Sequence, residues 1–175
     1  IQKGSVLNEK KLTALNENLE KIVEARTEEI QKQITSLNRE IEIRIKVEQL
    51  LKKLTAAVEQ SPVSIVITDR NGVTEYVNPT FSSITGYSPE EVIGQNQNIL
   101  KGETSSEVYQ DLWKTVMSGK IWKGELINRK KNGDLYYEET VISPITNFNN
   151  ELINFIAVKR DVTEDKTIQS QLNIL

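Results

Sequence analysis

Apolar residues recur at intervals of three and four along the first third of the chain, with charged and amide side chains between them. This heptad spacing is typical of helices that supercoil around a partner helix. After Gly4 the segment up to about residue 60 has no proline or glycine and is rich in good helix formers, so it predicts one long helix or two in tandem. Two runs, spaced 3-4-3 and 4-3-4, make up the apolar seam: Leu12, Leu15, Leu19 and Ile22, then Ile30, Ile34, Leu37 and Ile41.

A stripe this narrow predicts a parallel homodimer, because a helix with one apolar seam is marginally stable without a partner. The alternative is a single solvated helix that serves as a spacer. The two runs are out of phase, since Ile22 and Ile30 are eight positions apart, and the alternating residues from Ile41 to Val47 make a second irregularity. Such changes of phase fit a helix with two nearly equal packings.

The pattern changes at Ser61-Pro62, where proline ends the predicted long helix. β-branched runs then predict strands, and Ser/Thr-x-x-Glu capping boxes at Ser88–Glu91 and Thr104–Glu107 predict the starts of helices. The elements expected from this pattern are strands at 63–68 and 73–77, short helices at 78–87 and from 88, and a longer helix from 104 to 119.

Two strand-like runs between Ile121 and Thr146 meet at Asn132-Gly133. Asn-Gly predicts a type I′ hairpin turn, because both residues tolerate the positive φ that this turn needs. A last strand is expected at 152–162, with apolar residues on both of its faces, and a helix after Thr163. The whole predicts an α+β domain with a five-stranded, mostly antiparallel sheet. We expect short helices to cover one face of the sheet, and the N-terminal helix or a partner subunit to cover the other.

One face of the strand that begins at Trp122 combines different chemistries. Successive strand side chains point to opposite faces, so one face carries Trp122, Gly124, Leu126 and Asn128. These residues provide an aromatic ring, a position without a side chain, an aliphatic side chain and an amide. This face suits the wall of a pocket for a flat ligand with polar edges. Alternatively, Trp122 and Leu126 belong to the core and Asn128 is an ordinary strand amide.

Composition narrows the function more than any motif does. The chain has no Cys and no His, which excludes disulfides, thiolate metal sites, Ser–His or Cys–His catalysis and a phosphoacceptor histidine within this sequence. A net charge of −3 without a basic cluster argues against nucleic acid as a partner. We therefore expect no enzymatic activity and no metal site in this chain.

No apolar run approaches the length of a membrane span. Because the chain begins at Ile1 and its only methionine is Met117, we expect it to be part of a longer protein. An output domain, and any membrane anchor upstream, would lie in the remainder.

Residues about 53 to 165 resemble the PAS family of sensor domains. The resemblance rests on pieces in family order and spacing: A-A-V-E-Q-S-P (56–62), I-T-D-R-N-G (67–72), Y-V-N-P-T-F (76–81), I-T-G-Y-S-P-E-E-V-I-G (84–94), N-R-K-K-N-G-D-L-Y-Y (128–137), S-P-I (143–145) and R-D-V-T-E (160–164). The helix before it resembles the signalling coiled coils of sensor kinases, cyclases and chemotaxis transducers. The resemblance implies a PAS fold and three segments: coiled-coil helix 1–52, PAS domain 53–164, and the start of an exit linker helix 165–175.

The run from Ile121 to Tyr137 is most similar to flavin-binding PAS domains of the NifL and Aer types. That similarity implies FAD as a cofactor, with Trp122 lining the flavin site and Asn128 bonding the ring edge. Asn96 and Gln97 fall where light-sensing LOV domains carry their adduct cysteine. Because Gln97 takes the cysteine's place, LOV-type photochemistry is not expected.

Two further positions depart from the LOV pattern. Lys159 falls where LOV domains have a flavin-facing glutamine, and Glu138 where they have an asparagine. A buried charge needs a partner, and these two are candidates to pair across adjacent strands. The alternatives to flavin are a core filled by its own side chains or another small ligand. Asp161 and Thr163 resemble the family's exit motif, and they also fit a simple helix cap.

Together these features predict a cytoplasmic sensory PAS domain of a bacterial type of signal-transduction protein, such as a two-component system. As a homodimer it would relay ligand or redox state through its flanking helices to the output domain, which in such proteins is a histidine kinase or cyclase. The alternative is a ligand-free PAS module that serves only dimerisation.

Overall fold

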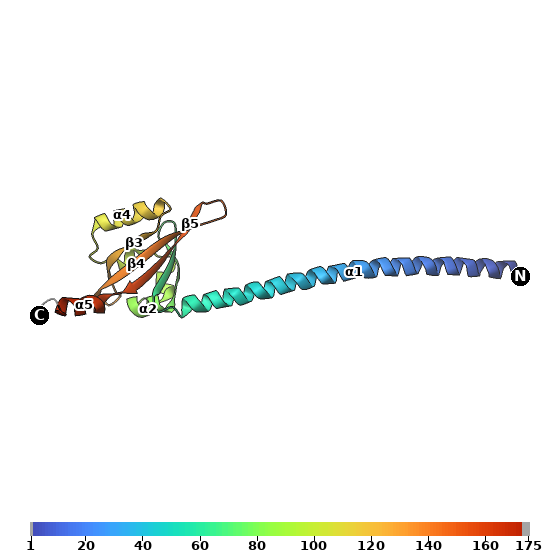
Figure 1. Cartoon of the computed structure of the whole chain (residues 1–175), viewed down its shortest axis with the longest axis horizontal. Helices are drawn as coiled ribbons and strands as arrows, with labels where there is room; N and C mark the ends of the chain where they lie inside the picture. Colours follow the sequence, from blue (N-terminus) through green and yellow to red (C-terminus); the bar gives the residue numbers. More distant parts are fainter. Residues whose placement is uncertain (1, 173–175) are drawn as a thin grey trace. The chain divides into compact units, whose positions relative to one another are not determined.

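The computed structural model describes residues 2–172, with side chains from residue 7 onward. The chain divides into two units, residues 1–53 and 54–175. The described part of the first unit lies within α1 (Gln2–Glu59), a single helix, which is drawn in blue to green in Figure 1. None of the helices that the structure describes is long and apolar enough to cross a membrane.

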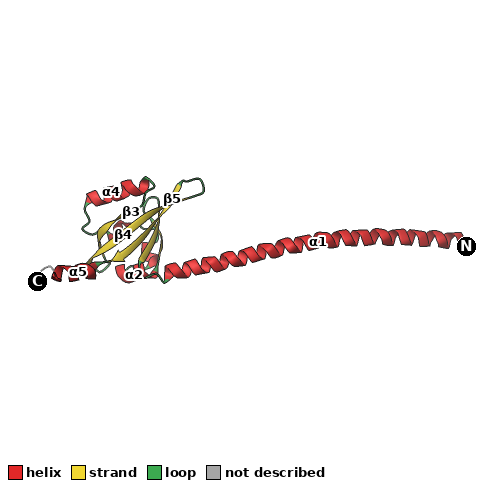
Figure 2. Cartoon of the chain, viewed as in Figure 1, coloured by secondary structure: helices red, strands yellow, loops and turns green. Residues whose placement is uncertain are grey.

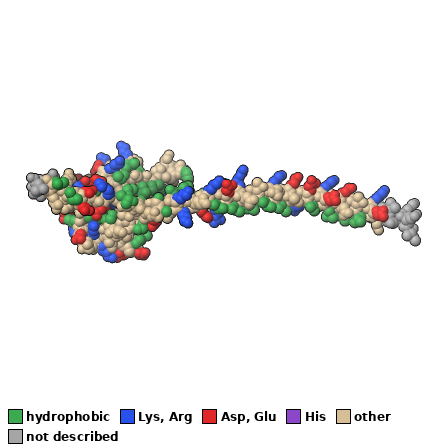
Figure 3. All heavy atoms as spheres, turned by 60° about the horizontal axis from the view of Figure 1, so that its bottom comes forward, with side chains coloured by type: hydrophobic (Ala, Val, Ile, Leu, Met, Phe, Trp, Pro, Cys, Tyr) green, Lys and Arg blue, Asp and Glu red, His purple; other side chains and the backbone are tan. Residues whose placement is uncertain are grey.

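The apolar seam of α1 forms a continuous stripe. Figure 3 shows hydrophobic side chains in green along one side of the helix and charged side chains along another. The eight seam residues from Leu12 to Ile41 are each between 43% and 59% exposed. The helical prediction is therefore confirmed, and the stripe is open along its length in this single chain.

The second unit contains a five-stranded antiparallel sheet with strand order β2-β1-β5-β4-β3. Its strands are drawn in yellow in Figure 2. This confirms the predicted α+β fold. The strands are β1 (Ser64–Asp69), β2 (Thr74–Val77), β3 (Trp122–Arg129), β4 (Leu135–Thr146) and β5 (Leu152–Asp161). The helices are α2 (Pro79–Thr85), α3 (Pro89–Val92), the 3₁₀ turn η1 (Gln97–Leu100), α4 (Ser106–Met117) and α5 (Thr163–Leu172).

One face of the sheet carries the core, in two clusters. The first packs α2, α3 and η1 on β1, β2 and β5: Val66, Val77, Phe81, Val92, Leu100 and Ala157. The second packs α4 on β3 and β5: Leu112, Val116, Trp122, Leu126 and Phe155. The opposite face is partly open, since Tyr137 on β4 and Val158 on β5 are 37% and 38% exposed. Side chains that alternate along each strand thus separate a covered face from an outer one.

The β3–β4 turn differs from the prediction. Gly133 has a φ of 96°, but Asn132 does not have a positive φ; among the described non-glycine residues only Asn150 does. The Gly133 N–H donates to Lys130 O (2.9 Å) and the Lys130 N–H donates to Asp134 O (2.8 Å). This is a three-residue loop with glycine in the left-handed position, and the type I′ prediction is wrong. The Asn132 amide instead accepts from Asp134 N and donates to the Asp134 carboxylate.

The two predicted capping boxes have different outcomes. Ser88 N donates to the Glu91 carboxylate at 2.9 Å, which confirms the box at the start of α3. α4 begins later than its signature predicts, with Ser105 as N-cap. Thr104 does not cap this helix, because its hydroxyl bonds the backbone N–H and C=O of Ile127 at 2.6 and 3.1 Å. It thereby holds the loop before α4 against β3.

The β4–β5 turn is organised by one side chain, Asn147. Its Oδ1 accepts from the N–H groups of Asn149 (2.9 Å) and Glu151 (3.0 Å), and its Nδ2 donates to the Glu151 carboxylate (2.8 Å). Asn150, at φ 60°, completes the reversal. The tip of this long hairpin is therefore a defined turn.

Asn78 joins the end of α1 to the sheet and to α2. Its side chain is fully buried and takes part in four hydrogen bonds. Oδ1 accepts from Ile65 N (2.9 Å) and Phe81 N (3.2 Å), and Nδ2 donates to Val58 O (3.1 Å) and Val63 O (2.9 Å). The residue therefore caps α2 while it bonds the last turn of α1. We call this the Asn78 junction.

Asn78→Ala is expected to destabilise the second unit by about 3–5 kcal/mol, because it leaves several buried backbone groups without a partner. Urea unfolding followed by tryptophan fluorescence measures this unit alone, since both tryptophans, Trp113 and Trp122, lie in it. Asn149→Ala, at an exposed turn amide, is the matched control and should cost little. Equal costs for the two variants would contradict the role of the junction.

Candidate functional site

A cavity of about 90 Å³ lies between the covered face of the sheet and the segments η1 and α4. Its lining is largely apolar, with side chains such as Val66, Leu126 and Phe155. Polar groups are few, and they include Asn96, Gln97, Asn128 and Lys159. An apolar chamber with a small number of placed polar groups is the usual form of a small-molecule site.

A buried ion pair lies on the sheet beside this cavity. Lys159 Nζ on β5 is 3.1 Å from Glu138 Oε1 on β4, and the two side chains are 8% and 3% exposed. On the other side of β4, Asn128 Nδ2 donates to the same oxygen at 2.8 Å. The Thr140 hydroxyl donates to it as well, at 3.2 Å. We call these four residues the Glu138 cluster.

The sheet order explains how this cluster forms. β4 lies between β5 and β3, so a carboxylate on its covered face is reached from both neighbours. The register places Lys159 opposite Thr140, and Asn128 opposite Tyr136, each one pleat away from Glu138. The expected pairing of Glu138 with Lys159 is thus confirmed, and Asn128 and Thr140 complete it.

Gln97 Oε1 and Tyr136 Oη are among the buried polar atoms without a hydrogen-bond partner in the part of the chain that the structure describes. Gln97 Nε2 donates to Thr74 Oγ1 at 2.7 Å, which ties the amide to β2. Burial, and then the negative charge of Glu138, raise the pKa of the Tyr136 hydroxyl strongly. Tyr136 is therefore a neutral phenol throughout the physiological range.

Trp122 lies apart from the other predicted site residues. Its ring belongs to the core cluster with Leu112 and Val116, and its indole N–H donates to Asp111 Oδ2 at 2.9 Å. The ring lies over Gly124, where an added Cβ would come within 2.5 Å of it. Trp122 is not among the residues that line the cavity, whereas Asn96, Gln97, Asn128 and Lys159 are.

Trp113 on α4 and Gly72 in the β1–β2 turn meet at the edge of the cavity. Gly72 has a φ of +80°, and a Cβ there would lie 3.1 Å from the Trp113 ring and 3.2 Å from Asn96 Nδ2. The Trp113 ring also meets Phe155 edge to face, with centroids 5.9 Å apart. This indole therefore bridges the turn and the sheet over one side of the chamber.

A flavin does not fit the cavity as these side chains stand. Cofactor and drug-sized pockets enclose about 300–1,000 Å³, whereas this cavity has about 90 Å³. One N–H of the Asn128 amide donates to Glu138, so only the second N–H and the amide oxygen remain for a ring edge. A three-ring system would need Gln97, Trp113 or the Glu138 cluster to move.

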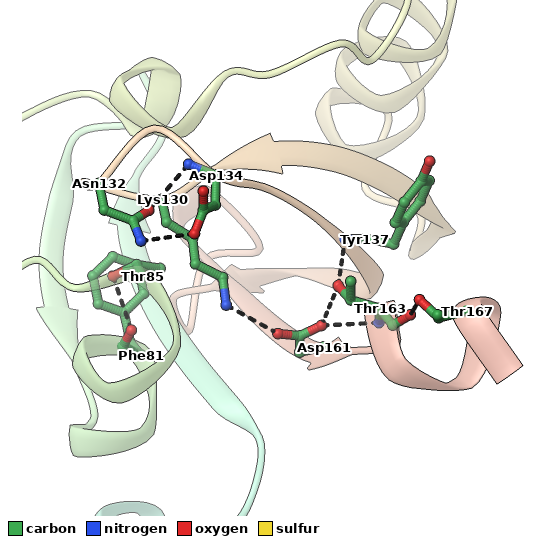
Figure 4. A network of polar contacts seen from close by, with 9 residues as sticks. All are labelled: Phe81, Thr85, Lys130, Asn132, Asp134, Tyr137, Asp161, Thr163 and Thr167. Atoms are coloured by element: carbon green, nitrogen blue, oxygen red, sulfur yellow. Dashed lines mark hydrogen bonds and ion pairs between the residues drawn. The ribbon is translucent and has the colours of Figure 1, made fainter.

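The end of the domain is organised around Asp161 (Figure 4). Asp161 Oδ1 accepts from the Thr163 N–H at 3.0 Å and from the Thr163 hydroxyl at 2.6 Å. Tyr137 N on β4 donates to the same hydroxyl at 2.9 Å, and Lys130 Nζ lies 3.6 Å from Asp161 Oδ2. The two predicted exit residues therefore lie together where β5 passes into α5.

Glu59 and Tyr76 form a second link beside the Asn78 junction. The Tyr76 hydroxyl donates to the carboxylate of Glu59, the last residue of α1. Burial, and then this bond to a carboxylate, raise the pKa of Tyr76 to about 12. The Tyr76 phenol is thus protonated and able to donate at neutral pH, and the bond is lost as the pH rises through that value.

Comparison with known proteins agrees with this architecture. The nitrogen fixation regulatory protein of Klebsiella oxytoca is 36% identical over 116 residues, which cover 66% of this chain and 23% of that protein. A blue-light photoreceptor of Listeria innocua is 33% identical over 120 residues, which cover 66% of this chain and 47% of that protein. A solved RNA-binding Light-Oxygen-Voltage receptor superposes with a TM-score of 0.66 at 26% identity, covering 73% of this chain and 37% of that chain.

A fold of this kind, with a chamber under a five-stranded sheet, defines a sensor domain. Residues 62–164 match the PAS domain family, and the chain belongs to that family. The chain spans less than a quarter of the nitrogen fixation regulatory protein and under half of the photoreceptor.

Several residues around the site were not anticipated from the sequence. Thr140 could have been found, because it lies two positions after Glu138 on the same strand face. Asn78 was interpreted only as the start of a helix, although Asn before Pro also permits bonds to distant backbone. Asp111 carried no signal, because its bond to Trp122 depends on how α4 packs on the sheet.

Lys159→Met is expected to cost about 3–5 kcal/mol, because it leaves the buried Glu138 carboxylate without its counter-ion. The double variant Lys159→Met/Glu138→Gln should recover most of that loss, since it removes both charges. The control is Arg160→Met on the outer face, where Arg160 pairs with Glu139 in solvent, and it should cost about 0–1 kcal/mol. Urea unfolding by tryptophan fluorescence gives all three values. A double variant no more stable than Lys159→Met would contradict the pairing.

Proposed function

We propose that this chain is the sensory domain of a signal-transduction protein, and that it relays the state of its cavity through its flanking helices to an output domain in the same protein. One observation carries the proposal. Lys159, which lines the cavity, and Asp161, which begins the contacts to α5, are two residues apart on β5. The cavity and the outgoing helix are thus connected by one short piece of strand.

The relay needs a rigid connection at each end of the domain. At the start, Asn78 and Tyr76 bond the last turn of α1. At the end, Asp161 and Tyr137 hold the first residue of α5. A change at the Glu138 cluster would alter the bonding between β4 and β5. This change would reach α1 and α5, because each of these helices is hydrogen-bonded to the sheet.

The proposed working form is a homodimer joined by a parallel coiled coil of α1. The support is the open apolar stripe from Leu12 to Ile41, which a second copy of the same helix would cover. The changes of phase in that stripe would give the paired helices two nearly equal packings. A small rotation at the domain could then select one of them.

FAD is the second candidate for what the cavity senses. The likeness to proteins such as a blue-light photoreceptor favours it. If the chamber widened to admit a flavin, Asn96, Gln97 and Asn128 are the residues that would hold the ring edge, and redox state would become the sensed property. A ligand-free dimerisation module is the other reading, and the small volume of the cavity favours it.

The double variant Leu19→Glu/Leu37→Glu should convert a dimer into a monomer, because it places charges on the apolar seam. Light scattering of the purified chain measures the mass directly. Glu17→Lys, which lies off the seam, is the control and should leave the mass unchanged. A double variant with the mass of the parent protein would refute the coiled-coil dimer.

Protein purified from a host that makes FAD is expected to show no flavin band in its visible absorption spectrum, because the cavity is smaller than a flavin ring system. A stoichiometric flavin band would show that the chamber opens, and would make redox sensing the preferred function. Acid release and chromatography of any bound chromophore would then identify it.

A further inference from the structure

The chain contains two Asn-Gly pairs, Asn71-Gly72 and Asn132-Gly133. In such a pair the glycine nitrogen can attack the side-chain amide carbon of the asparagine, since glycine has no Cβ to obstruct the approach. The attack closes a five-membered ring within one chain, so the proximity of the two groups favours it. The two pairs share this chemistry, and their surroundings in the fold decide which of them reacts.

The fold holds the first pair from several sides. Gly72 is buried, and a Cβ there would lie 3.1 Å from the Trp113 ring. The Gly72 C=O accepts from Gln97 N at 3.1 Å, and Asn71 O accepts from Asn96 Nδ2 at 2.9 Å. The Gly72 nitrogen can therefore reach the Asn71 amide carbon only if this turn separates from η1 and from the Trp113 ring.

The second pair is held by residues of its own hairpin. Asn132 and Gly133 are both exposed, and a Cβ at Gly133 would meet no atom within 4 Å. The Gly133 N–H donates to Lys130 O at 2.9 Å, and the Gly133 C=O accepts from Arg129 Nη1 at 2.9 Å. Because both partners lie so close in the sequence, the tip can open locally while the sheet stays intact.

Asp134 also activates the Asn132 amide. Its N–H donates to Asn132 Oδ1 at 3.0 Å, and its Oδ2 accepts from Asn132 Nδ2 at 2.8 Å. The N–H group stabilises the negative charge that develops on Oδ1 when the amide carbon is attacked, as a donor in an oxyanion hole does. Among the described residues Asn71 Oδ1 has no such donor, and Asn71 Nδ2 donates to Asp69 Oδ2 at 3.3 Å.

We propose that Asn132 is a site of spontaneous deamidation and that the fold protects Asn71 in the same dipeptide. The Gly133 nitrogen bonds to the Asn132 amide carbon and loses its proton, the Cγ–Nδ2 bond breaks, and the NH₂ group leaves with a proton as ammonia. Water then adds to the cyclic imide. Addition at Cγ gives an aspartate, and addition at the main-chain carbonyl gives an isoaspartate, whose main chain is one carbon longer. This inference does not depend on the proposed sensory function.

The product changes the loop that carries two lysine contacts. The new carboxylate replaces the amide that donates to Asp134 Oδ2, so two like charges replace a hydrogen bond. In the same loop the Lys131 N–H donates to Thr85 O at 2.9 Å, and Lys130 Nζ lies 3.6 Å from Asp161 Oδ2 (Figure 4). Deamidation is therefore expected to weaken the contact between Lys130 and Asp161, where β5 passes into α5.

Peptide mapping of the whole 175-residue chain, after incubation at mildly alkaline pH, tests the choice of site. Cleavage after glutamate at acidic pH gives one peptide for each pair, residues 60–75 with Asn71 and residues 126–138 with Asn132. The second peptide should gain one mass unit at least about tenfold faster, because fewer contacts must break at the exposed tip. Equal rates, or a faster gain in residues 60–75, would overturn the proposal.

Asn132→Gln identifies the reacting residue within its peptide, which also contains Asn128. Glutamine would have to close a six-membered ring, which forms far more slowly, so residues 126–138 should no longer gain mass. A gain that persists in this variant would assign the reaction to Asn128 and overturn the proposal.

Denaturation and one variant test whether the fold causes the difference between the two pairs. In guanidinium chloride the contacts of both turns are lost, so the two peptides should react at similar rates. Asn96→Ala removes the donor to Asn71 O, so it should speed the reaction at Asn71 and leave the rate at Asn132 unchanged. A difference that survives denaturation, or an unchanged rate at Asn71 in the folded variant, would overturn the protection by the fold.

The effect on the end of the domain is measured on the deamidated chain itself, which anion exchange separates because the reaction adds one negative charge. The amide NMR signal of Thr163, whose N–H donates to Asp161 Oδ1, reports the contacts of Asp161. This signal should shift in the deamidated chain. It should stay in place in Asn149→Asp, the matched control, which adds the same charge at the tip of the β4–β5 hairpin. A signal that stays in place in both proteins would overturn the effect on Asp161.

Discussion

Two opposite charges, buried in the middle of a five-stranded sheet, impose the central constraint on this domain. Removing Lys159 and Glu138 from water is costly, and their attraction compensates only if the remaining lone pairs and protons are also satisfied. Three strands bring donors to one oxygen of Glu138: Lys159 from β5, Thr140 from β4 itself and Asn128 from β3. The positions of β3 and β5 against β4 are therefore coupled through one carboxylate oxygen.

This arrangement makes the centre of the domain both polar and electrically neutral. The surrounding residues of the cavity are mainly aliphatic or aromatic, so a change in the bonding of Glu138 would not be screened by water. The same strands end at Asp161 and Tyr137, which hold the beginning of α5. A sensor with this design would respond to hydrogen bonding inside the chamber rather than to net charge.

Local patterns in the sequence predicted the elements well. The long helix, the five strands and the exit cluster of Asp161 and Thr163 each depend on periodicity or on side chains that bond nearby backbone. Strand alternation also identified the shared face of Trp122, Leu126 and Asn128, because the two-residue period applies wherever a strand forms.

The features that the sequence did not predict depend on tertiary packing. The alternation of strand side chains could not predict that Trp122 belongs to the core and Asn128 to the cavity. Helix α4 covers one end of their shared face and leaves the other end to the cavity. Thr104 lies at the position where the sequence predicts a helix cap, but its hydroxyl accepts a hydrogen bond from Ile127 N on β3 instead. The Asn132-Gly133 turn takes another form, because only one of the two residues adopts a positive φ.

The Asn147 turn at the tip of the β4–β5 hairpin has a consequence for folding. A slip of β5 by one residue would turn Arg160 inward in place of Lys159, and Ile156 and Val158 in place of Phe155 and Ala157. After this slip a positive and a negative side chain would still pair, and apolar side chains would still be buried. Neither the ion pair nor apolar burial therefore strongly disfavours the slipped register. The three bonds of the Asn147 side chain fix the alignment of the two strands instead. The pairing of the innermost charges thus depends on a turn at the solvent-exposed end of the hairpin.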